Sequence, residues 1–372
     1  MLVVLVVAVK VSPYNKHKRK EYSSILVNAG MELFFAQKIT LPLPYMEKIL
    51  LIQTSFIGDV ILATALLEQL HDRYPDSRID LLVRKGNESL FKDHPFLGEL
   101  YVWDKKAGKY KDLWRILKLV RAQGYDLLLN LQRFGTTGLF TVLSGAKETR
   151  GFQKNPFAPF FSKAYPHEIG NGTHEVERNQ ILVGDLCKAG AFKPKLYPAP
   201  IDEATYGIEQ PFVCMAPNSV WFTKMLPKQR WVELLKCMPK GIDIVLLGAP
   251  NEAEFCQEII DASGVEGNVY NLCGKLSLLQ SAALMSRAKM NYVNDSAPLH
   301  LCSAVNAPQV AFFCSTSPSF GFTPMSDKSI ILEAEPQPSC KPCGLHGKKL
   351  CPEGHFKCGE IGLHSAVEMA IN

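Results

Sequence analysis

The chain has 372 residues, 47% of them hydrophobic and 21% charged, and carries a formal net charge of +5. This length accommodates two domains of ordinary size, and the composition is that of a globular protein with a large core. Residues 1–45 hold six basic and two acidic side chains, a balance of +4 (6 − 2), which leaves the remainder near neutral at +1 (5 − 4). This distribution predicts no nucleic-acid partner, and no apolar run approaches the ~20 residues that cross a bilayer.

Residues 1–45 contain no complete folding unit, and Met46 immediately precedes the first predicted strand. We therefore expect a flexible extension or an over-long start assignment, outside the fold in either case. The apolar beginning lacks both the basic region and the cleavage site of a secretory signal. The basic run 16–20 is interpreted as a solvated cluster, with contact to anionic lipid as the alternative.

Strands and helices alternate in the first half of the chain. Ile49–Ile52 is a continuous apolar run typical of a buried parallel strand, and apolar residues recur at helical spacing from Val60 to Leu70. Tyr74 and Pro75 end this helix. The other predicted elements are strands at 78–83, 101–103 and 125–131 and helices at 113–123 and 175–189.

The second half repeats the alternation, and the interdomain connection is expected near 200–210. Its predicted elements are strands at 212–215, 243–247, 290–293 and 309–313 and helices at 229–238, 252–263, 276–288 and 298–304. This pattern predicts an α/β fold made of two doubly wound domains, 46–205 and 206–372. A cleft between two such domains is a natural ligand site.

Asp59 is the candidate catalytic residue. It follows the first strand and a short polar turn, and Gly58 stands where that turn must be tight. Ligands of open α/β sheets bind at the carboxyl ends of strands, where an exposed carboxylate can act as a base. The alternative is that Asp59 caps the helix, which is worth about 1 kcal/mol, and spacing alone favours the cap.

Two segments of the second half suit a phosphate group. In Asn294–His300 a strand gives way to a helix with Pro298 in its first turn, so free N–H groups with Ser296 and His300 nearby suit a diphosphate. The alternative is that Asp295 or Ser296 simply caps the helix. The loop 217–227 contains Lys224 and two hydroxyl residues, Ser219 and Thr223, which can bind a phosphate group through a positive charge and hydroxyl groups. The alternative is that Lys224 is an ordinary lysine exposed to solvent.

Glu252 and the cysteines complete the candidate residues. Glu252 follows another strand end, where it can bind ribose hydroxyls or merely begin a helix. Seven of the eleven cysteines are scattered among apolar residues and indicate reduced thiols in a cytosolic protein. The other four are Cys340, Cys343, Cys351 and Cys358. Their spacing suits a structural zinc ion, with His346 and His355 as alternative ligands, although reduced thiols and disulfides together are as well supported.

In combination these segments resemble the ADP-heptose:lipopolysaccharide heptosyltransferases of glycosyltransferase family 9. The resemblance rests on the segments 49–60, 174–179, 223–224 and 294–300, in order and at family spacing, and it covers roughly residues 47 to 365. It implies a GT-B fold of two Rossmann-like domains, with the acceptor in the N-terminal domain and the donor in the C-terminal one.

The resemblance also implies roles for individual residues. Asp59 matches the general base, and Lys224 the lysine at the donor phosphates, with Thr223 beside it. Glu252 matches the acid that binds the donor ribose. The residues that match the diphosphate loop and helix start are Asp295, Ser296, Ala297 and His300. Ala297 replaces a usual glycine there, and Met225-Leu226-Pro227 replaces a basic–aromatic–proline sequence.

The expected activity is an inverting, metal-independent transfer of heptose from ADP-heptose to a lipid-linked lipopolysaccharide inner-core acceptor. No cofactor is required, and the sequence contains no D-x-D motif for a catalytic metal. Another nucleotide-sugar donor, a non-catalytic sugar-binding protein and a sugar-nucleotide epimerase are the alternatives. We expect a cytoplasmic protein in peripheral contact with the inner membrane. Basic residues near N-domain strand ends are candidates for an acidic acceptor: Arg84, Lys85, Arg133, Arg150 and Lys154.

Overall fold

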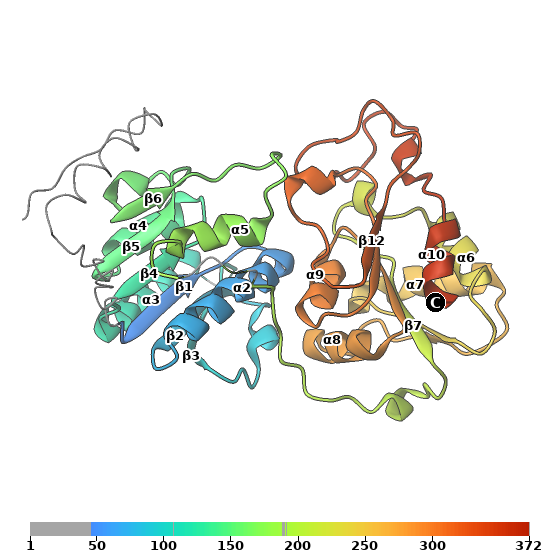
Figure 1. Cartoon of the computed structure of the whole chain (residues 1–372), viewed down its shortest axis with the longest axis horizontal. Coiled ribbons are helices and arrows are strands. Elements are labelled where there is room, and N and C mark those ends of the chain that lie inside the picture. Colours follow the sequence, from blue (N-terminus) through green and yellow to red (C-terminus); the bar gives the residue numbers. More distant parts are fainter. Residues whose placement is uncertain (1–45, 107, 188–189, 191, 372) are drawn as a thin grey trace, which may run out of the picture. The chain divides into compact units, whose positions relative to one another are not determined.

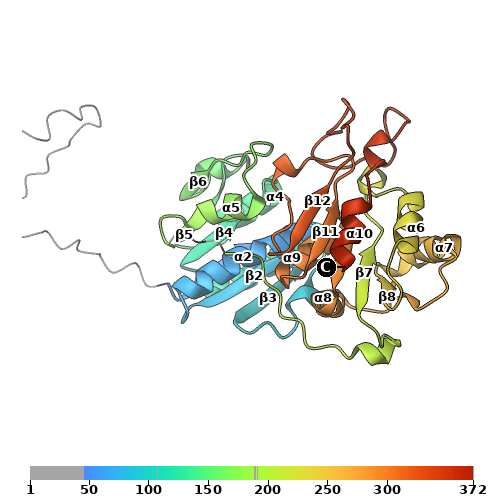
Figure 2. The same ribbon diagram turned by 45° about the vertical axis from the view of Figure 1, so that its right-hand side comes forward.

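The computed structural model describes residues 46–371 except 107, 188, 189 and 191. The expectations for residues 1–45 therefore lie outside the described residues. The described chain contains two six-stranded sheets with helices packed on them, and every pair of neighbouring strands is parallel (Figures 1 and 2). The predicted α/β architecture of doubly wound parallel sheets is confirmed.

The first sheet has the order β3-β2-β1-β4-β5-β6. Its strands are β1 (Lys48–Ile52), β2 (Arg78–Arg84), β3 (Leu97–Trp103), β4 (Leu127–Asn130), β5 (Glu148–Phe152) and β6 (Lys163–Tyr165). Its helices are α2 (Ile57–Arg73), α3 (Lys109–Gln123), α4 (Gly135–Leu143) and α5 (Glu175–Gln180). Alternate β1 residues point to opposite faces: Ile49 and Leu51 join the core under α2, whereas Leu50 and Ile52 join the core under α3 and α4. Burial on both faces explains why β1 is a continuous apolar run.

The second sheet has the order β12-β11-β10-β7-β8-β9. Its strands are β7 (Phe212–Ala216), β8 (Asp243–Leu246), β9 (Val269–Asn271), β10 (Met290–Asn294), β11 (Gln309–Phe312) and β12 (Ser329–Leu332). Its helices are α6 (Lys228–Lys236), α7 (Ala253–Ser263), α8 (Leu278–Arg287), α9 (Ala297–Ala304) and α10 (His364–Ile371). Counted from its own first strand, the order again reads 3-2-1-4-5-6, as in the first sheet. The two halves therefore share one topology, which is that of Rossmann-like domains.

Several elements differ from the sequence expectation. The helix expected over 175–189 is wrong in length, because α5 ends at Gln180 and gives way to a 3-10 turn over Ile181–Val183. Gly184 follows, and glycine in a helix interior costs about 1 kcal/mol relative to alanine. The third strand begins at Leu97 rather than at Tyr101. Four strands and two helices were not predicted: β5, β6, β9, β12, α4 and α10.

The helix α2 also packs against a helix of the second sheet. It contacts α9, and both helices contribute to one continuous core of buried aliphatic side chains. Leu66 and Leu67 of α2 and Leu299 and Leu301 of α9 belong to that core. Complete burial of one such leucine stabilises the fold by about 1.5–3 kcal/mol. This packing holds the start of α2 near the start of α9.

Candidate active site

The shared topology places the candidate residues at two equivalent positions. In each sheet the strand order reverses between the first and fourth strands, and ligands bind beyond the carboxyl ends of those strands. In the first sheet these are β1 and β4, which are followed by Asp59 and Arg133. In the second sheet they are β7 and β10, which are followed by Lys224 and Asp295.

Asp59 is not the N-cap of its helix, and the interpretation favoured by spacing alone is wrong on this point. The helix begins at Ile57, so the cap position belongs to Phe56, which makes no side-chain capping hydrogen bond. Asp59 is the third helical residue, in the first turn. A carboxylate there interacts favourably with the helix dipole, and the backbone N–H group of the N-cap residue Phe56 is one of its neighbours.

The environment of Asp59 opposes ionisation. Its half-buried position removes the carboxyl group from water, and this raises its pKa from 3.8 to about 6. The negative charge of Glu175 acts in the same direction, while nearby backbone N–H groups and the positive charge of Arg133 lower the pKa by less. A carboxyl group with this pKa is mostly ionised at pH 7 and can still accept and release a proton.

Glu175 belongs to a buried charge network at the start of α5. Its carboxylate lies 2.7 Å from Nε of Arg178 and 3.2 Å from Nε2 of His167. Burial alone would raise the pKa of Glu175, but these two partners outweigh it and the pKa is lowered. Arg178 also donates to the Phe320 carbonyl oxygen at 2.9 Å, and His174 Nε2 lies 3.1 Å from the Thr323 carbonyl oxygen. The segment 174–178 therefore fastens α5 to a loop of the second sheet.

Lys224 and Asp295 form a largely buried ion pair. Lys224 closes a 3-10 turn over Phe222–Lys224, and its Nζ lies 2.7 Å from Oδ2 of Asp295. Thr316 donates to the same oxygen at 2.6 Å. The side chains are only 16% and 7% exposed, so the pair is weakly screened by water. An incoming phosphate group would compete with Asp295 for the ammonium group.

Thr223 has a supporting position. It is 1% exposed, and its hydroxyl oxygen accepts from the backbone N–H of Lys348 at 2.7 Å and from the Ser315 hydroxyl at 3.0 Å. The Thr223 N–H donates to the Lys348 carbonyl oxygen at 3.1 Å. These hydrogen bonds fix the loop 217–227 to the segment Cys340–Cys358, which we call the terminal cysteine segment.

The terminal cysteine segment also packs directly on Lys224. A Cβ atom at Gly347 would lie 2.6 Å from Cγ of Lys224 and 2.6 Å from Cβ of Trp221, so only glycine fits there without a shift. Burial lowers the pKa of the neighbouring His346, and the positive charges of Lys224 and Arg133 act in the same direction. The sequence offers His346 only as an alternative zinc ligand. The position of Gly347 and His346 beside Lys224 could not be predicted, because no local pattern connects them with a loop more than a hundred residues away.

The start of α9 is open to a ligand. Its N-cap is Ser296, whose side chain makes no capping hydrogen bond, so the alternative of a Ser296 cap is not supported. Ser296, Ala297 and Pro298 are half-buried. Ala297 is the first helical residue, and an ordinary helical backbone does not require the glycine that is usual in the family. The N-terminus of a helix attracts a phosphate group through its N–H groups and its dipole.

His300 connects the starts of α9 and α2. A Cβ atom at Gly58 would lie 2.7 Å from Cδ2 of His300, so glycine is needed at this close approach. His300 is 5% exposed, and burial lowers its pKa to about 3. The ring is therefore neutral at pH 7 and contributes no positive charge to a diphosphate. Its Nδ1 is buried and has no hydrogen-bond partner within the described chain.

Glu252 and Ser219 lie near the same sheet edge but are engaged locally. Glu252 accepts a hydrogen bond from the Ala249 N–H at 2.7 Å, and burial raises the pKa of its carboxyl group. The Ser219 hydroxyl accepts from the Trp221 N–H at 3.4 Å. Both side chains are half-buried, and each would have to exchange this contact for one with a ligand.

The five basic residues expected at the acceptor do not form one surface. Arg150 is fully buried and pairs with Glu148 at 2.7 Å and with Asp185, so its assignment to the acceptor is wrong. The Arg84 guanidinium lies over the Phe56 ring at 4.7 Å. Lys85 pairs with Asp104 at 2.7 Å, and Lys154 is exposed. Arg133 is the member of this set whose charge acts on Asp59.

The four terminal cysteines lie near one another, and all eleven cysteines are free. Burial raises the pKa of Cys358 to about 11, and Cys343, Cys351 and Cys340 act in the same direction. Cys340 Sγ lies 3.9 Å from Nε2 of His355. Within residues 46–371, apart from the gaps, no group of three or more His, Cys, Asp or Glu side chains is arranged to hold a metal ion. The zinc ion stays a prediction.

Two Rossmann-like sheets, with candidate residues at both switch points, define the GT-B class of glycosyltransferases. The sequence profile of glycosyltransferase family 9 (heptosyltransferase) matches residues 113–352, and the chain belongs to that family. The resemblance predicted from the sequence is thereby confirmed.

Individual relatives are distant in sequence but similar over most of their length. Lipopolysaccharide heptosyltransferase 3 of Escherichia coli is 26% identical over 294 residues, which are 74% of this chain and 85% of the relative. Lipopolysaccharide heptosyltransferase 1 of Pseudomonas aeruginosa is 25% identical over 80% of this chain and 86% of its own.

Solved structures confirm the fold. ADP-heptose lps heptosyltransferase II of E. coli superimposes with a TM-score of 0.68 at 20% identity, over 87% of this chain and 98% of that one. A family 9 glycosyl transferase from Veillonella parvula gives a TM-score of 0.69 at 22% identity, over 78% and 87%. In the described part of the chain, no helix combines the length and apolarity needed to cross a membrane.

Proposed function

We propose that this heptosyltransferase-family protein transfers heptose from ADP-heptose to a hydroxyl group of a lipid-linked lipopolysaccharide inner-core acceptor. The transfer inverts the anomeric centre and needs no metal ion. We place the enzyme in the cytoplasm, in peripheral contact with the inner membrane. The eleven free cysteines agree with a reducing compartment.

In the proposed reaction the acceptor oxygen attacks the anomeric carbon as Asp59 takes the hydroxyl proton. The bond between the anomeric carbon and the diphosphate oxygen breaks on the opposite face of the sugar, so the configuration inverts. The negative charge that develops on the diphosphate is met by Lys224 and by the start of α9. A lysine and a helix N-terminus can supply this stabilisation without a metal ion.

The observation that best supports the proposal is the environment of Asp59, the proposed proton acceptor. Asp59 follows the switch point of the first sheet with a pKa of about 6, and it is not the N-cap residue of its helix. A general base is most effective when its pKa lies near the working pH. The contact between Gly58 and His300 brings this base close to the helix start that would hold the diphosphate.

The donor identity is the finer part of the proposal. The E. coli relative that shares this fold is described as an ADP-heptose enzyme, which supports ADP-heptose as the first donor to test. Glu252 is positioned after β8, beside β7, where it can reach the ribose of a nucleotide bound at the β7–β10 switch point. Its present hydrogen bond to Ala249 is local and can be exchanged.

The test is direct transfer in the presence of EDTA. The purified full chain would be incubated with ADP-heptose, ADP-glucose or UDP-glucose and an acceptor ending in the inner-core sugar, and the product's anomeric configuration determined by NMR. We expect transfer from ADP-heptose alone, with inversion and without loss in EDTA. Transfer from another donor would replace ADP-heptose, while donor binding without transfer would favour a sugar-binding protein.

A matched pair of variants tests the acceptor side. Arg133→Glu places a negative charge near Asp59 and should raise the acceptor KM several-fold without changing donor affinity. Lys154→Glu makes the same change of charge at an exposed position, and Lys154 is not among the charges that shift the pKa of Asp59. Equal acceptor KM values for the two variants and the wild type would remove Arg133 from the acceptor site.

A further inference from the structure

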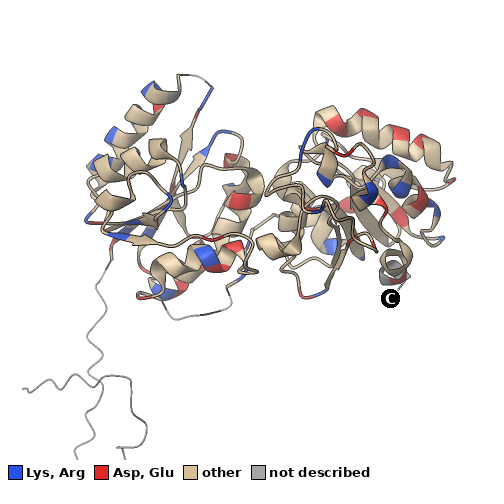
Figure 3. Ribbon diagram, turned by 90° about the horizontal axis from the view of Figure 1, so that it is seen from above, with Lys and Arg blue, Asp and Glu red and all other residues tan. Residues whose placement is uncertain are grey.

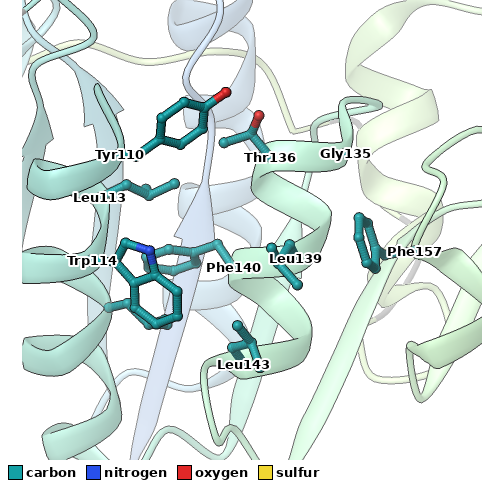
Figure 4. A pocket seen from close by; sticks show the side chains of 10 residues that line it. Tyr110, Leu113, Trp114, Gly135, Thr136, Leu139, Phe140, Leu143 and Phe157 are labelled. Carbon is teal, nitrogen blue, oxygen red and sulfur yellow. The ribbon is translucent and has the colours of Figure 1, made fainter. Parts of the chain in front are cut away.

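An apolar groove lies on the surface of the first sheet's unit, between α3 and α4 (Figure 4). It has a volume of about 240 Å³, and α3 and α4 line it together with Phe157 of the loop after β5. Trp114 of α3 and Leu139 of α4 are 53% and 42% exposed. Phe160, which is 69% exposed, lies beside Phe157 with ring centroids 6.4 Å apart. Contiguous exposed apolar side chains of this kind mark an interaction site.

The rim of the groove along α3 is basic. The helix contains five Lys or Arg residues and a single acid, Asp112, which pairs with Arg115 at 2.7 Å. Trp114, Lys118 and Arg121 are spaced i, i+4 and i+7, so they follow one side of the helix. All three are exposed. Figure 3 shows the Lys and Arg residues of the described chain in blue and the Asp and Glu residues in red.

We propose that the α3–α4 groove and its basic rim bind the surface of an anionic phospholipid bilayer. Tryptophan and tyrosine are enriched at the level of lipid headgroups, and a helix with an apolar side and Lys/Arg beside it lies in that interface. The excess of positive charge on α3 complements anionic headgroups. The groove admits the apolar part of the interface between the two helices.

The groove also lies in the right place for the reaction. The helix α4 begins at Gly135, two residues after Arg133, whose charge acts on Asp59. The apolar surface thus extends from the acceptor end of the first sheet along the outside of the molecule. This part of the argument rests on the proposed function, because an acceptor with a lipid anchor must present its sugar to Asp59 while the anchor stays in the bilayer.

A second copy of the chain fits this surface less well. In a symmetric dimer the same patch meets itself, so the basic side of α3 would face another basic side. Like charges in direct opposition disfavour such a contact. A bilayer with anionic headgroups meets both the apolar and the charged part of the patch.

Vesicle flotation of the full chain tests the proposal. The chain should float with vesicles of phosphatidylethanolamine and phosphatidylglycerol, but not with phosphatidylcholine vesicles, and high salt should release it. Two basic residues near the surface each contribute several-fold to binding, so Lys118→Glu/Arg121→Glu should lower the bound fraction at least ~10-fold. The matched reversal Lys236→Glu/Lys240→Glu, at exposed positions around the end of α6, should have little effect.

Tryptophan fluorescence identifies the face that meets the lipid. Trp103 and Trp231 are buried and Trp221 is half-buried, so Trp114 is the exposed tryptophan of the described chain. Lipids brominated on the acyl chains should quench the wild type strongly. Trp114→Phe should float equally well but lose most of the quenching. Trp114→Ser should lose flotation, whereas Leu350→Ser, at a position 77% exposed, should keep it.

Three outcomes would overturn the proposal. The first is flotation that survives in Lys118→Glu/Arg121→Glu and in Trp114→Ser. The second is quenching that survives in Trp114→Phe. The third is a dimer in sedimentation that these substitutions in α3 dissociate. Residues 1–45 remain in every variant, so lipid binding through them would appear as the first outcome. The α3 variants should keep their kcat/KM for an acyl-free acceptor, so lipid binding and transferase activity fail independently.

Discussion

Asp59 and Asp295 occupy related positions in the two sheets, yet their surroundings are opposite. Each follows a strand that borders a switch point and lies close to the start of a helix. Asp295 is 5% exposed, pairs with Lys224 at 2.7 Å and accepts from Thr316 at 2.6 Å. Asp59 has no salt-bridge partner within 4.0 Å in the described chain, and its pKa is raised to about 6.

The difference separates two chemical tasks. A carboxylate that is paired with a lysine holds the ammonium group of that lysine in place. A carboxylate that lacks such a partner and is partly removed from water exchanges protons readily near pH 7. One carboxylate is therefore suited to proton transfer, and the other to the positioning of a positive charge.

The largest effect is expected from removal of the proton acceptor. Asp59→Asn keeps the shape of the side chain but cannot take the proton from the hydroxyl group of the sugar acceptor, so kcat should fall at least ~10²-fold. Donor affinity should stay unchanged, because the variant leaves Lys224 and α9 intact. Steady-state kinetics and calorimetry with ADP measure the two quantities.

The same variant should not be less stable. Burial disfavours the charged form of Asp59, so the folded-state pKa lies above the unfolded value of 3.8. The destabilising contribution of the ionised group is absent below that value and develops as the pH rises towards about 6. Asp59→Asn should therefore match or exceed the wild-type Tm at pH 7.5. A lower Tm together with normal turnover would return Asp59 to a structural role.

Substitution of Lys224, the residue proposed to hold the donor phosphates, should change the affinity for ADP. Lys224→Ala removes a charge-assisted contact to the diphosphate and also exposes the ligand to Asp295, so the Kd for ADP should rise about 10-fold or more. Asp295→Asn in the same chain should recover part of the loss. Lys228→Ala, which breaks an exposed pair with Glu258, serves as the control. Unchanged ADP affinity in Lys224→Ala would contradict the assignment.

The pH dependence of kcat/KM and of donor binding in the wild type tests the difference between Asp59 and Asp295. Because Asp59 must be ionised to act, kcat/KM should fall tenfold per pH unit below about 6 and level off above it. Binding of ADP-heptose should lack that step, because both phosphate groups of the donor are esterified and neither titrates near pH 6. An acid limb centred near pH 4 would show that burial does not raise the pKa of Asp59, and an acid limb near pH 6 that persists in Asp59→Asn would show that another group titrates.

The smallest effect is expected in the terminal cysteine segment. Cys343→Ser should lower Tm by a few degrees, at a cost of roughly 1–2 kcal/mol. Because this segment fixes Thr223 and packs on Lys224, ADP affinity should fall a few-fold, while the pH profile stays unchanged. Cys237→Ser, at an exposed cysteine of the second sheet's unit, is the control. Metal analysis under reducing conditions tests the predicted zinc ion.

The sequence predicts best where one local signal dominates. The apolar run of β1 and the helical spacing of α2 give both elements within a few residues of their observed bounds. The segment 294–300 likewise predicts the transition from β10 to α9. In contrast α4 contains two glycines and three threonines, which form helices poorly in isolation, and tertiary packing stabilises it instead.

Side-chain environments depend on contacts between distant residues and are harder to predict. The sequence makes Arg150 a candidate for the acceptor surface, yet it lies within β5, and the fold buries it against Asp185. Thr223 stands beside the predicted donor lysine, but its hydroxyl group supports the loop through Lys348. In each case the partner comes from an element whose position is determined only in the folded chain.

The hydrogen bonds between Thr223 and Lys348 join residues 125 positions apart. A ribosome releases the chain from its N-terminus, and domains fold as they emerge. The strand and helix that carry Asp59 can therefore form early, whereas the loop that carries Lys224 stays unsupported until nearly the whole chain has been made. A chain cut short before the terminal cysteine segment would keep the elements around Asp59 but would lack the hydrogen bonds that support the loop of Lys224. Under the proposed function, such a chain would retain its general base and bind the donor poorly.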